Sequence, residues 1–263
     1  MNMTRLIDMH AHLDLMSNAD DVAARLDGAG LAMFDCGVDP RDYQTAVKRD
    51  DKFGGIEAGL GLHPWWIADG HCGSAEVDLL CKLAASVRFI GEVGLDFSPR
   101  FRGTEGTQTE AFGRLCKTLA THPLPHRVMS IHAVRAAGAV LDTLERHGLL
   151  KASPYSPAIV FHWFSGASDD FTRARAAECY FSINERMLAT KRGREYARQV
   201  STDQMLLETD YPAQAGEMVE ADSIESSLLR AARTIADLKN VETAFIRQRT
   251  AKNAAQLLAL DIA

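Results

Sequence analysis

The sequence predicts an α/β protein that folds as a single (β/α)8 barrel of the TIM type over residues 1–263. Short apolar runs alternate with longer amphipathic stretches along the whole chain, which favours a parallel sheet covered by helices. Eight such runs in 263 residues give about 33 residues per repeat, the expected size of a βα unit. Eight units and this chain length favour closure into one barrel over an open sheet.

The strands are expected where β-branched, aromatic and other apolar residues cluster in short runs between turn signals. In chain order, the expected strands are residues 6–10, 32–37, 56–62, 89–93, 128–132, 159–162, 180–183 and 205–208.

The longer stretches between these runs repeat apolar residues at helical spacing. The helices expected among them are residues 74–86, 105–121, 135–147, 168–177, 185–200 and 220–238. Residues 250–260 are expected to form a last helix that closes over the barrel. Because no low-complexity linker divides the chain, we expect one domain.

Composition excludes several classes of protein. With 46% hydrophobic and 24% charged residues, the chain is neither disordered nor a fibrous repeat. The formal net charge is −6, from 29 Lys and Arg against 35 Asp and Glu. This acidity excludes a protein that holds nucleic acid through bulk positive charge. It still allows a nuclease whose positive charge is bound metal.

The five cysteines are scattered and form no CxxC pair, so neither a disulfide framework nor a cysteine-rich zinc site is expected. The first residues lack the apolar core of a signal peptide, and no apolar run reaches the length of a membrane span. We therefore expect a cytoplasmic enzyme with no membrane partner.

Histidines and acids recur where the expected strands end. His10 and His12 are two residues apart, so on a strand both point to one face and form half of a divalent metal site. The ends of the other strands supply His63, Glu92, Asp96, His132, His162 and Asp210. In an α/β barrel these ends converge on the C-terminal mouth, where active sites lie.

Taken alone, each residue has a structural explanation, since one histidine can be a hydrogen-bonded core residue and one acid can cap a helix. Six strand ends with ligand-type side chains point instead to bound metal, because burying so many unpaired polar groups costs several kcal/mol each. Imidazoles and carboxylates without a thiolate suit Zn, Mn or Mg. Four histidines and two acids exceed one tetrahedral shell, which predicts two divalent ions bridged by a carboxylate.

These motifs together resemble the TatD-type metal-dependent deoxyribonucleases of the amidohydrolase-like barrels. The matching motifs are Ile-Asp-Met-His-Ala-His-Leu-Asp at 7–14, Gly-Leu-His-Pro at 61–64, Gly-Glu-Val-Gly-Leu-Asp at 91–96, His132, His-Trp-Phe-Ser-Gly at 162–166, Glu-Thr-Asp at 208–210 and Asn253. They follow the order of the family along nearly the whole chain.

The resemblance implies metal-dependent hydrolysis of DNA phosphodiesters, often as a 3′-exonuclease on single strands. By motif, His10, His12 and Asp210 would hold one ion, and His132 and His162 the second. Glu92 would bridge the two ions as one catalytic residue. Asp210 would be the other, taking a proton from the attacking water, and His63 would lie behind the ligands or against a phosphate. Relatives that bridge their metals with a carbamylated lysine are disfavoured, because residues 89–96 contain no lysine.

A narrower resemblance is to the TatD-type nuclease subunit of Qat anti-phage systems, through residues 128–132, 162–166 and 180–183. It implies partner proteins of the same defence module. The chain departs from the wider family in having Trp163 in place of a frequent Cys and Arg135 one residue later than the usual arginine. On a helix start that shift rotates the arginine by about 100°, which weakens its role as a phosphate ligand.

Other residues are candidates for substrate contact. Trp65 and Trp163 either stack on nucleobases or pack the loops, and Asp96 and Arg135 lie at the same mouth. The basic run at 191–194 is either a solvated helix face or a DNA track. Two other functions stay open: a small-molecule phosphoesterase or amidohydrolase on the same barrel, and a mainly scaffolding subunit of a defence complex.

Overall fold

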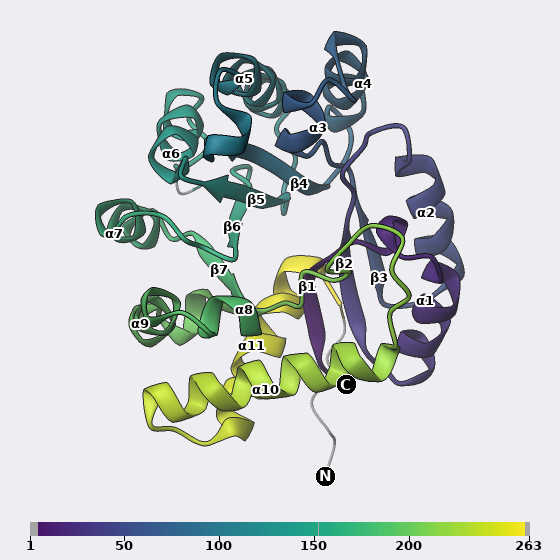
Figure 1. Ribbon diagram of the computed structural model, residues 1–263, viewed down its shortest axis with the longest axis vertical. Helices are drawn as coiled ribbons and strands as arrows, with labels where there is room; N and C mark the ends of the chain where they lie inside the picture. The colour runs from purple at the N-terminus through teal and green to yellow at the C-terminus, as the bar shows by residue number, and fades with distance from the viewer. Residues whose placement is uncertain (1–4, 152, 261–263) are drawn as a thin grey trace.

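The computed structural model describes residues 5–151 and 153–260, and their parallel strands surround a common centre (Figure 1). The strands are β1 (Ile7–Ala11), β2 (Ala32–Cys36), β3 (Ile56–Gly59), β4 (Phe89–Asp96), β5 (Val128–Val134), β6 (Ala158–His162), β7 (Tyr180–Ile183) and β8 (Met205–Leu207). Each strand pairs in parallel with the next within two sheets, β1 to β3 and β4 to β8.

Two short junctions join these sheets into a closed ring. A bridge between Leu60 and Ile90 connects β3 to β4. Just beyond β8, the amide of Asp210 donates to the carbonyl of His10 over 2.8 Å, and the amide of His12 donates to the carbonyl of Tyr211 over 2.8 Å. The predicted (β/α)8 barrel is therefore confirmed.

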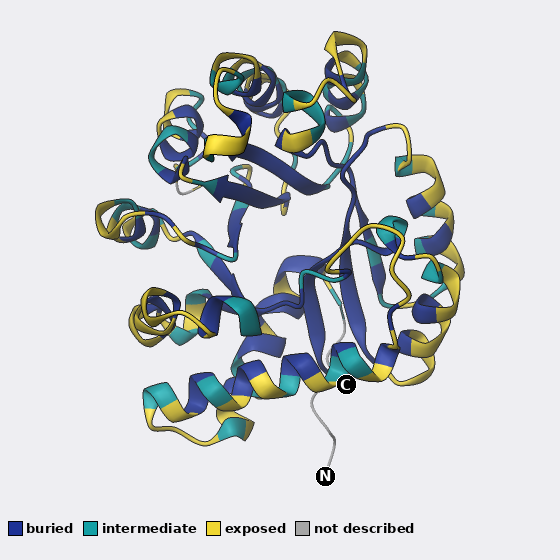
Figure 2. Ribbon diagram, in the orientation of Figure 1, coloured by how far each residue is buried: buried dark blue, intermediate teal, exposed yellow. Residues whose placement is uncertain are grey.

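Helices form the outer layer, and their inward faces are buried (Figure 2). They are α1 (Ala19–Gly28), α2 (Tyr43–Lys52), α3 (Pro64–Ala68), α4 (Ser74–Ala84), α5 (Glu105–Thr121), α6 (Ala137–Arg146), α7 (Ser168–Ala176), α8 (Glu185–Leu188), α9 (Lys191–Gln199), α10 (Ala221–Lys239) and α11 (Thr243–Leu258). Among the described residues, none of these helices combines the length and the apolar character that a membrane span requires.

Several boundaries differ from those expected. The helix expected over residues 185–200 is divided into α8 and α9, because the Thr190 hydroxyl caps a new helix by accepting from the amide of Gly193 over 2.9 Å. Trp65 lies in α3, not in a loop, since Pro64 begins a short helix there. The last helix starts at Thr243, seven residues before the expected position, and β4 runs on to Asp96.

Glycines allow β2, β3 and β4 to approach closely enough for the ring to close. A Cβ atom added to Gly61 would lie 1.6 Å from the carbonyl oxygen of Gly37, and one added to Gly37 would lie 2.5 Å from that of Gly59. Only a residue without a side chain fits at these positions. The glycine-rich approach to His63 is thus a requirement of barrel closure.

A cluster of apolar side chains forms the floor of the barrel, at the end opposite the mouth. Ile7, Phe34, Val160 and Leu206 belong to a small buried cluster with Leu258 of α11, so this helix packs against the barrel as expected. The Asn253 side chain fixes the helix by donating to the carbonyls of Thr202 and Met205 over 2.8 and 2.9 Å. Polar side chains follow this floor at the C-terminal ends of the strands.

Arg127 is a fully buried cation that is paired with backbone carbonyls. Its guanidinium donates to the carbonyls of Val87, His122 and Ala84 over 3.1, 3.0 and 3.0 Å. The last two follow or end helices, whose final carbonyls lack partners within the helix. Burial lowers the pKa of Arg127 to about 10, so the side chain stays charged at neutral pH.

Replacing Arg127 with methionine should lower the free energy of unfolding by about 3 kcal/mol, because several buried carbonyls lose their donor at once. Urea unfolding followed by circular dichroism measures this difference. Arg173→Met is the matched control, since Arg173 is only partly buried and pairs with Asp142 at the surface. It should cost less than about 1 kcal/mol. Equal losses in the two variants would contradict a structural role for Arg127.

Candidate metal centre

A pocket of about 710 Å³ opens where the strands end, and most of the residues expected at the mouth line it. Those lining it are His12, His63, Glu92, His132, His162, Asp210, Trp65 and Trp163. His10 lies fully buried behind His12. The structure therefore brings together side chains from six strand ends spread over 200 residues of sequence, from His10 to Asp210.

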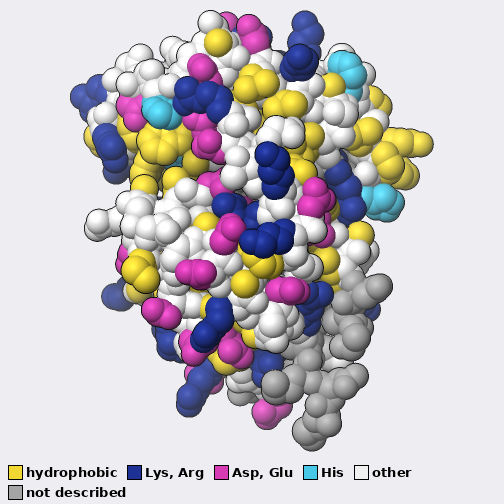
Figure 3. All heavy atoms as spheres, turned by 90° about the vertical axis from the view of Figure 1, so that its right-hand side faces the viewer, with side chains coloured by type: hydrophobic (Ala, Val, Ile, Leu, Met, Phe, Trp, Pro, Cys, Tyr) yellow, Lys and Arg dark blue, Asp and Glu magenta, His cyan; other side chains and the backbone are white. Residues whose placement is uncertain are grey.

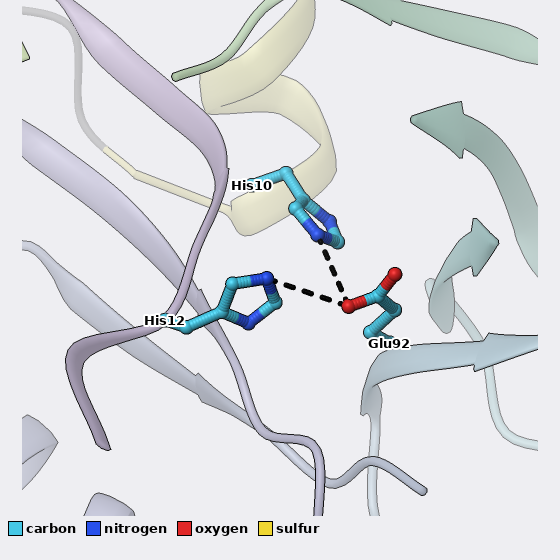
Figure 4. A group of neighbouring side chains, drawn as sticks. All are labelled: His10, His12 and Glu92. Carbon is cyan, nitrogen blue, oxygen red and sulfur yellow. Dashed lines mark ion pairs between the residues drawn. The ribbon is translucent and has the colours of Figure 1, made fainter. Parts of the chain in front are cut away.

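One oxygen of Glu92 faces His10 of β1 and His12, which follows the strand (Figure 4). Its Oε2 lies 3.6 Å from Nε2 of His10 and 3.4 Å from Nε2 of His12. Oδ1 of Asp210 lies 3.4 Å from the same nitrogen of His12. These four donor atoms surround one position on the β1 side of the carboxylate.

The other oxygen of Glu92 faces a second set of donors. Its Oε1 lies 2.7 Å from Nδ1 of His132 and 2.9 Å from Nε2 of His162. The two nitrogens are 3.3 Å apart. Two imidazole nitrogens bound to a tetrahedral zinc ion at about 2.05 Å lie about 3.3 Å from each other. The spacing fits a shared cation, and Glu92 separates two such sets.

Hydrogen bonds fix which ring nitrogen three of these histidines direct at the centre. Nδ1 of His12 contacts the carbonyl of Cys36 over 2.6 Å, so in the neutral ring Nδ1 carries the proton and Nε2 keeps its lone pair. Nδ1 of His10 is held by the Ser130 hydroxyl over 2.6 Å. Nε2 of His132 lies 3.3 Å from a carboxylate oxygen of Asp96, which leaves its Nδ1 free for the centre. Such outer partners are typical of metal-binding histidines.

His63 is oriented in the opposite sense. Its Nδ1 accepts from the backbone amide of Trp65 over 3.1 Å, so in the neutral ring Nε2 must carry the proton. That Nε2 lies 3.0 Å from Oε1 of Glu92. Although His63 is close enough to be grouped with Glu92 and His132 as a ligand, its tautomer makes it a hydrogen-bond donor into the pocket.

The donor set fits divalent metal. Nε2 of His10 is buried and has no hydrogen-bond partner in the described part of the chain. An unpaired buried nitrogen costs free energy, and a cation between His10, His12 and the two carboxylates would satisfy it. The atoms available are imidazole nitrogens and carboxylate oxygens, which suit Zn, Mn or Mg.

Without metal, the close packing of acids and histidines shifts the pKa values of these groups. Burial acts against the charge of Glu92, but the imidazoles of His63 and His162 outweigh it and hold the pKa of Glu92 well below its usual range. Burial likewise opposes the charge of His12, yet Asp210 and Glu92 raise its pKa to about 9. Burial, together with the charge of His162, lowers the pKa of His10 to about 3.

The contribution of the histidines at the centre to the stability of the metal-free protein should therefore be largest near pH 6.5. His12, His132 and His162 have raised pKa values, so they stabilise the fold below about 6.5 and this contribution is lost as the pH rises through about 9 for His12. His10 and His63 have lowered values, so stability also falls below about pH 6.5.

Bound metal requires unprotonated imidazoles, so the difference in Tm between Mn-loaded and metal-free protein should widen by several degrees between pH 6.5 and 9. Thermal denaturation at half-unit pH steps, with and without EDTA, measures it. A difference that stays constant over this range would contradict metal binding through these histidines.

The residues expected to contact substrate take different positions in the structure. Asp96 accepts from Nε1 of Trp65 over 2.6 Å and so ties this tryptophan to the outer side of His132. Trp65 and Trp163 line the pocket. Arg135 follows β5 with a positive φ of 55° and is not among the described residues that line the pocket.

Two further residues of the site were not predicted from the sequence. Glu208 is fully buried, accepts from Asn184 over 2.7 Å, and lies 3.8 Å from Nδ1 of His162. Its position in the Glu-Thr-Asp motif at the end of β8 was a signal for it. Arg186 of α8 lines the pocket beside Asp210. No sequence motif indicated it, because it lies in a short helix after β7 and not at a strand end.

The chain is similar in sequence to TatD-related proteins. A family model described as TatD related DNase matches residues 7–259. The human protein named deoxyribonuclease TATDN3 is 24% identical over 96% of this chain and 94% of its own length. The Shigella flexneri protein named 3′-5′ ssDNA/RNA exonuclease TatD is 28% identical over 73% of this chain and 72% of its own.

The fold likewise matches a solved structure. The crystal structure of YjjV, a TatD homologue from Escherichia coli, superposes with a TM-score of 0.77 and covers 98% of this chain and 99% of its own at 18% identity. This likeness supports the barrel architecture.

Proposed function

Because the chain belongs to the TatD-related DNase family, we propose that it hydrolyses phosphodiester bonds of DNA with two divalent cations at the mouth of the barrel. The observation that carries the proposal is the position of Glu92, whose two carboxylate oxygens face two separate sets of donors. Two divalent ions bound there would supply the charge that activates water and stabilises the attacking and leaving oxygens of a phosphodiester.

The residues that would hold the ions follow from the donor sets. His10, His12 and Asp210 would hold the first ion with Oε2 of Glu92. His132 and His162 would hold the second with Oε1. The ions would be Mg, Mn or Zn, the hard or borderline cations that this donor chemistry suits.

The chain's own residues supply the remaining steps. Asp210 is placed to accept a proton from the attacking water, since its Oδ1 faces the first donor set and its side chain is less buried than that of Glu92. His63 presents its Nε2 proton to the same space and would donate to a phosphate oxygen. Trp65 and Trp163 offer aromatic faces for unpaired bases.

The preferred substrate would be single-stranded DNA cleaved from its 3′ end. The Shigella relative is named a 3′-5′ exonuclease of single-stranded DNA and RNA. A pocket of about 710 Å³ falls within the size range of small-ligand sites, which fits an unpaired nucleotide at the end of a strand. We also propose a cytoplasmic enzyme of an anti-phage module with Qat-type partners, on the strength of its motifs at 128–132, 162–166 and 180–183. Its five cysteines are free, which fits a reducing compartment.

The test is cleavage of a 5′-labelled single-stranded oligonucleotide by purified protein in Mn²⁺ or Mg²⁺, with and without a blocked 3′ end. A ladder that shortens from the free 3′ end is expected, and the block should prevent it. Metal-loaded protein that cleaves no DNA yet hydrolyses a small phosphodiester would replace the proposal with small-molecule hydrolysis. If ligand substitutions left phage protection unchanged, a scaffolding role would replace it.

A further inference from the structure

Within the described part of the chain, Arg186 is the one lysine or arginine that lines the pocket at the barrel mouth. It lies on α8, directly after β7, where the strand ends at the barrel mouth. Around it the pocket wall is largely apolar, with Trp65, Trp66 and Trp163 among its residues. A single guanidinium therefore stands in a mostly apolar wall beside a cluster of metal-ligand side chains.

The side chain is held in place but retains free donors. Its Nη2 donates to the backbone carbonyl of Asp210 over 3.0 Å. Its Cζ lies 5.3 Å from the centre of the Trp163 ring, a cation–π distance. Nη1 is 3.5 Å from Oδ2 of Asp210. A guanidinium has five N–H groups, and the side chain is 36% exposed, so most of its donors remain available to a ligand.

Asp210 connects this arginine to the metal centre. Its Oδ1 faces His12, while its Oδ2 faces Arg186. An anion that binds next to the first donor set is therefore within reach of the guanidinium. The planar fork of arginine matches two oxygens of a phosphate.

We propose that Arg186 binds a non-bridging oxygen of the substrate phosphate at the metal centre, so that the site takes phosphate esters through this residue. The inference rests on the proposed function, since it names the group that recognises the phosphate of the same substrate. It assigns to Arg186 the role that the sequence suggested for Arg135.

The molecule has no broad excess of positive charge that could hold a phosphate backbone, which favours a single phosphate contact inside the pocket. Basic and acidic side chains are interspersed on the face in Figure 3, and the chain carries a net charge of −6. The basic run at 191–194 reaches the mouth only at its edge, where Nη1 of Arg192 lies 3.5 Å from the carbonyl of Ser165. Among the lysines and arginines that the structure describes, only Arg186 combines a place inside the pocket with free donors.

The test uses inorganic phosphate as the probe of the Mn-loaded protein. Arg186→Gln should weaken phosphate binding, measured by calorimetry, by about 10- to 100-fold, while Arg186→Lys loses less. The number of bound Mn ions, measured by mass spectrometry, should stay that of the wild type. With oligonucleotide substrate, the slope of log kcat/KM against log salt should become shallower by about 0.7, the value for one lost phosphate contact.

The matched control is Arg198→Gln on α9, because Arg198 is exposed and pairs with Glu195 of its own helix. It removes the same charge and should leave phosphate binding unchanged. Phosphate binding that survives Arg186→Gln, or a loss that Arg198→Gln reproduces, overturns the inference. So does a loss of bound Mn, since Arg186 would then act by holding Asp210. If wild-type protein binds phosphate but cleaves no DNA, the proposed substrate fails while the assignment of Arg186 stands.

Discussion

Replacing Glu92 with glutamine should reduce DNA cleavage by at least about 10³-fold and remove at least one bound divalent ion. Each carboxylate oxygen of Glu92 faces its own pair of histidine nitrogens, at 3.4 and 3.6 Å on one side and at 2.7 and 2.9 Å on the other. Glutamine has nearly the same shape, but its amide nitrogen is a donor and cannot bind a cation. The change thus removes a bridge and its negative charge while keeping the packing.

The measurement is metal content together with kcat, on protein shown to be folded by circular dichroism. Glu57→Gln provides the matched control, because Glu57 is a partly buried acid on the neighbouring strand β3, outside the pocket lining. It should retain wild-type activity and both ions. A Glu92→Gln protein that still binds two ions and cleaves DNA would refute the bridging role.

The fold was predictable because its pattern is repeated. Eight apolar runs at regular spacing leave few topologies other than a closed parallel barrel, and the strand ends of such a barrel must meet. For this reason His10, Glu92 and Asp210 were predicted to share a site although they lie far apart in sequence. Their residue types then indicated metal.

Other features depend on local geometry that residue types leave undetermined. The amide of Trp65 reaches Nδ1 of His63 only because Pro64 starts a short helix there, and this contact decides that His63 donates rather than ligates. The division of residues 185–200 at Thr190 places Arg186 on its own turn facing the pocket. The backbone of Arg135, with its positive φ, likewise follows from the turn after β5.

Asp210→Asn should lower kcat by about 10²–10³-fold at saturating metal, because asparagine cannot accept the proton of the attacking water. The substitution suits the backbone: Asp210 has a φ of 57°, a left-handed conformation that asparagine tolerates as well as aspartate. The amide oxygen can still face His12, so the structural change is confined to charge and proton affinity. Because neighbouring His12 helps to hold the pKa of Asp210 below its ordinary value against the effect of burial, the aspartate is ionised throughout the working pH range.

The distinguishing measurement is kcat with metal occupancy determined on the same sample. Asp203→Asn is the matched control. Asp203 lies before the first residue of β8, away from the mouth, and its exposed side chain pairs with the partly buried Arg249. If Asp210 accepts the proton, its variant should lose turnover even where enough Mn is added to fill both sites, and a stronger added base should restore part of it. Full recovery with excess Mn would show instead that Asp210 serves only as a ligand, and the proton would then have to leave by way of another group at the mouth.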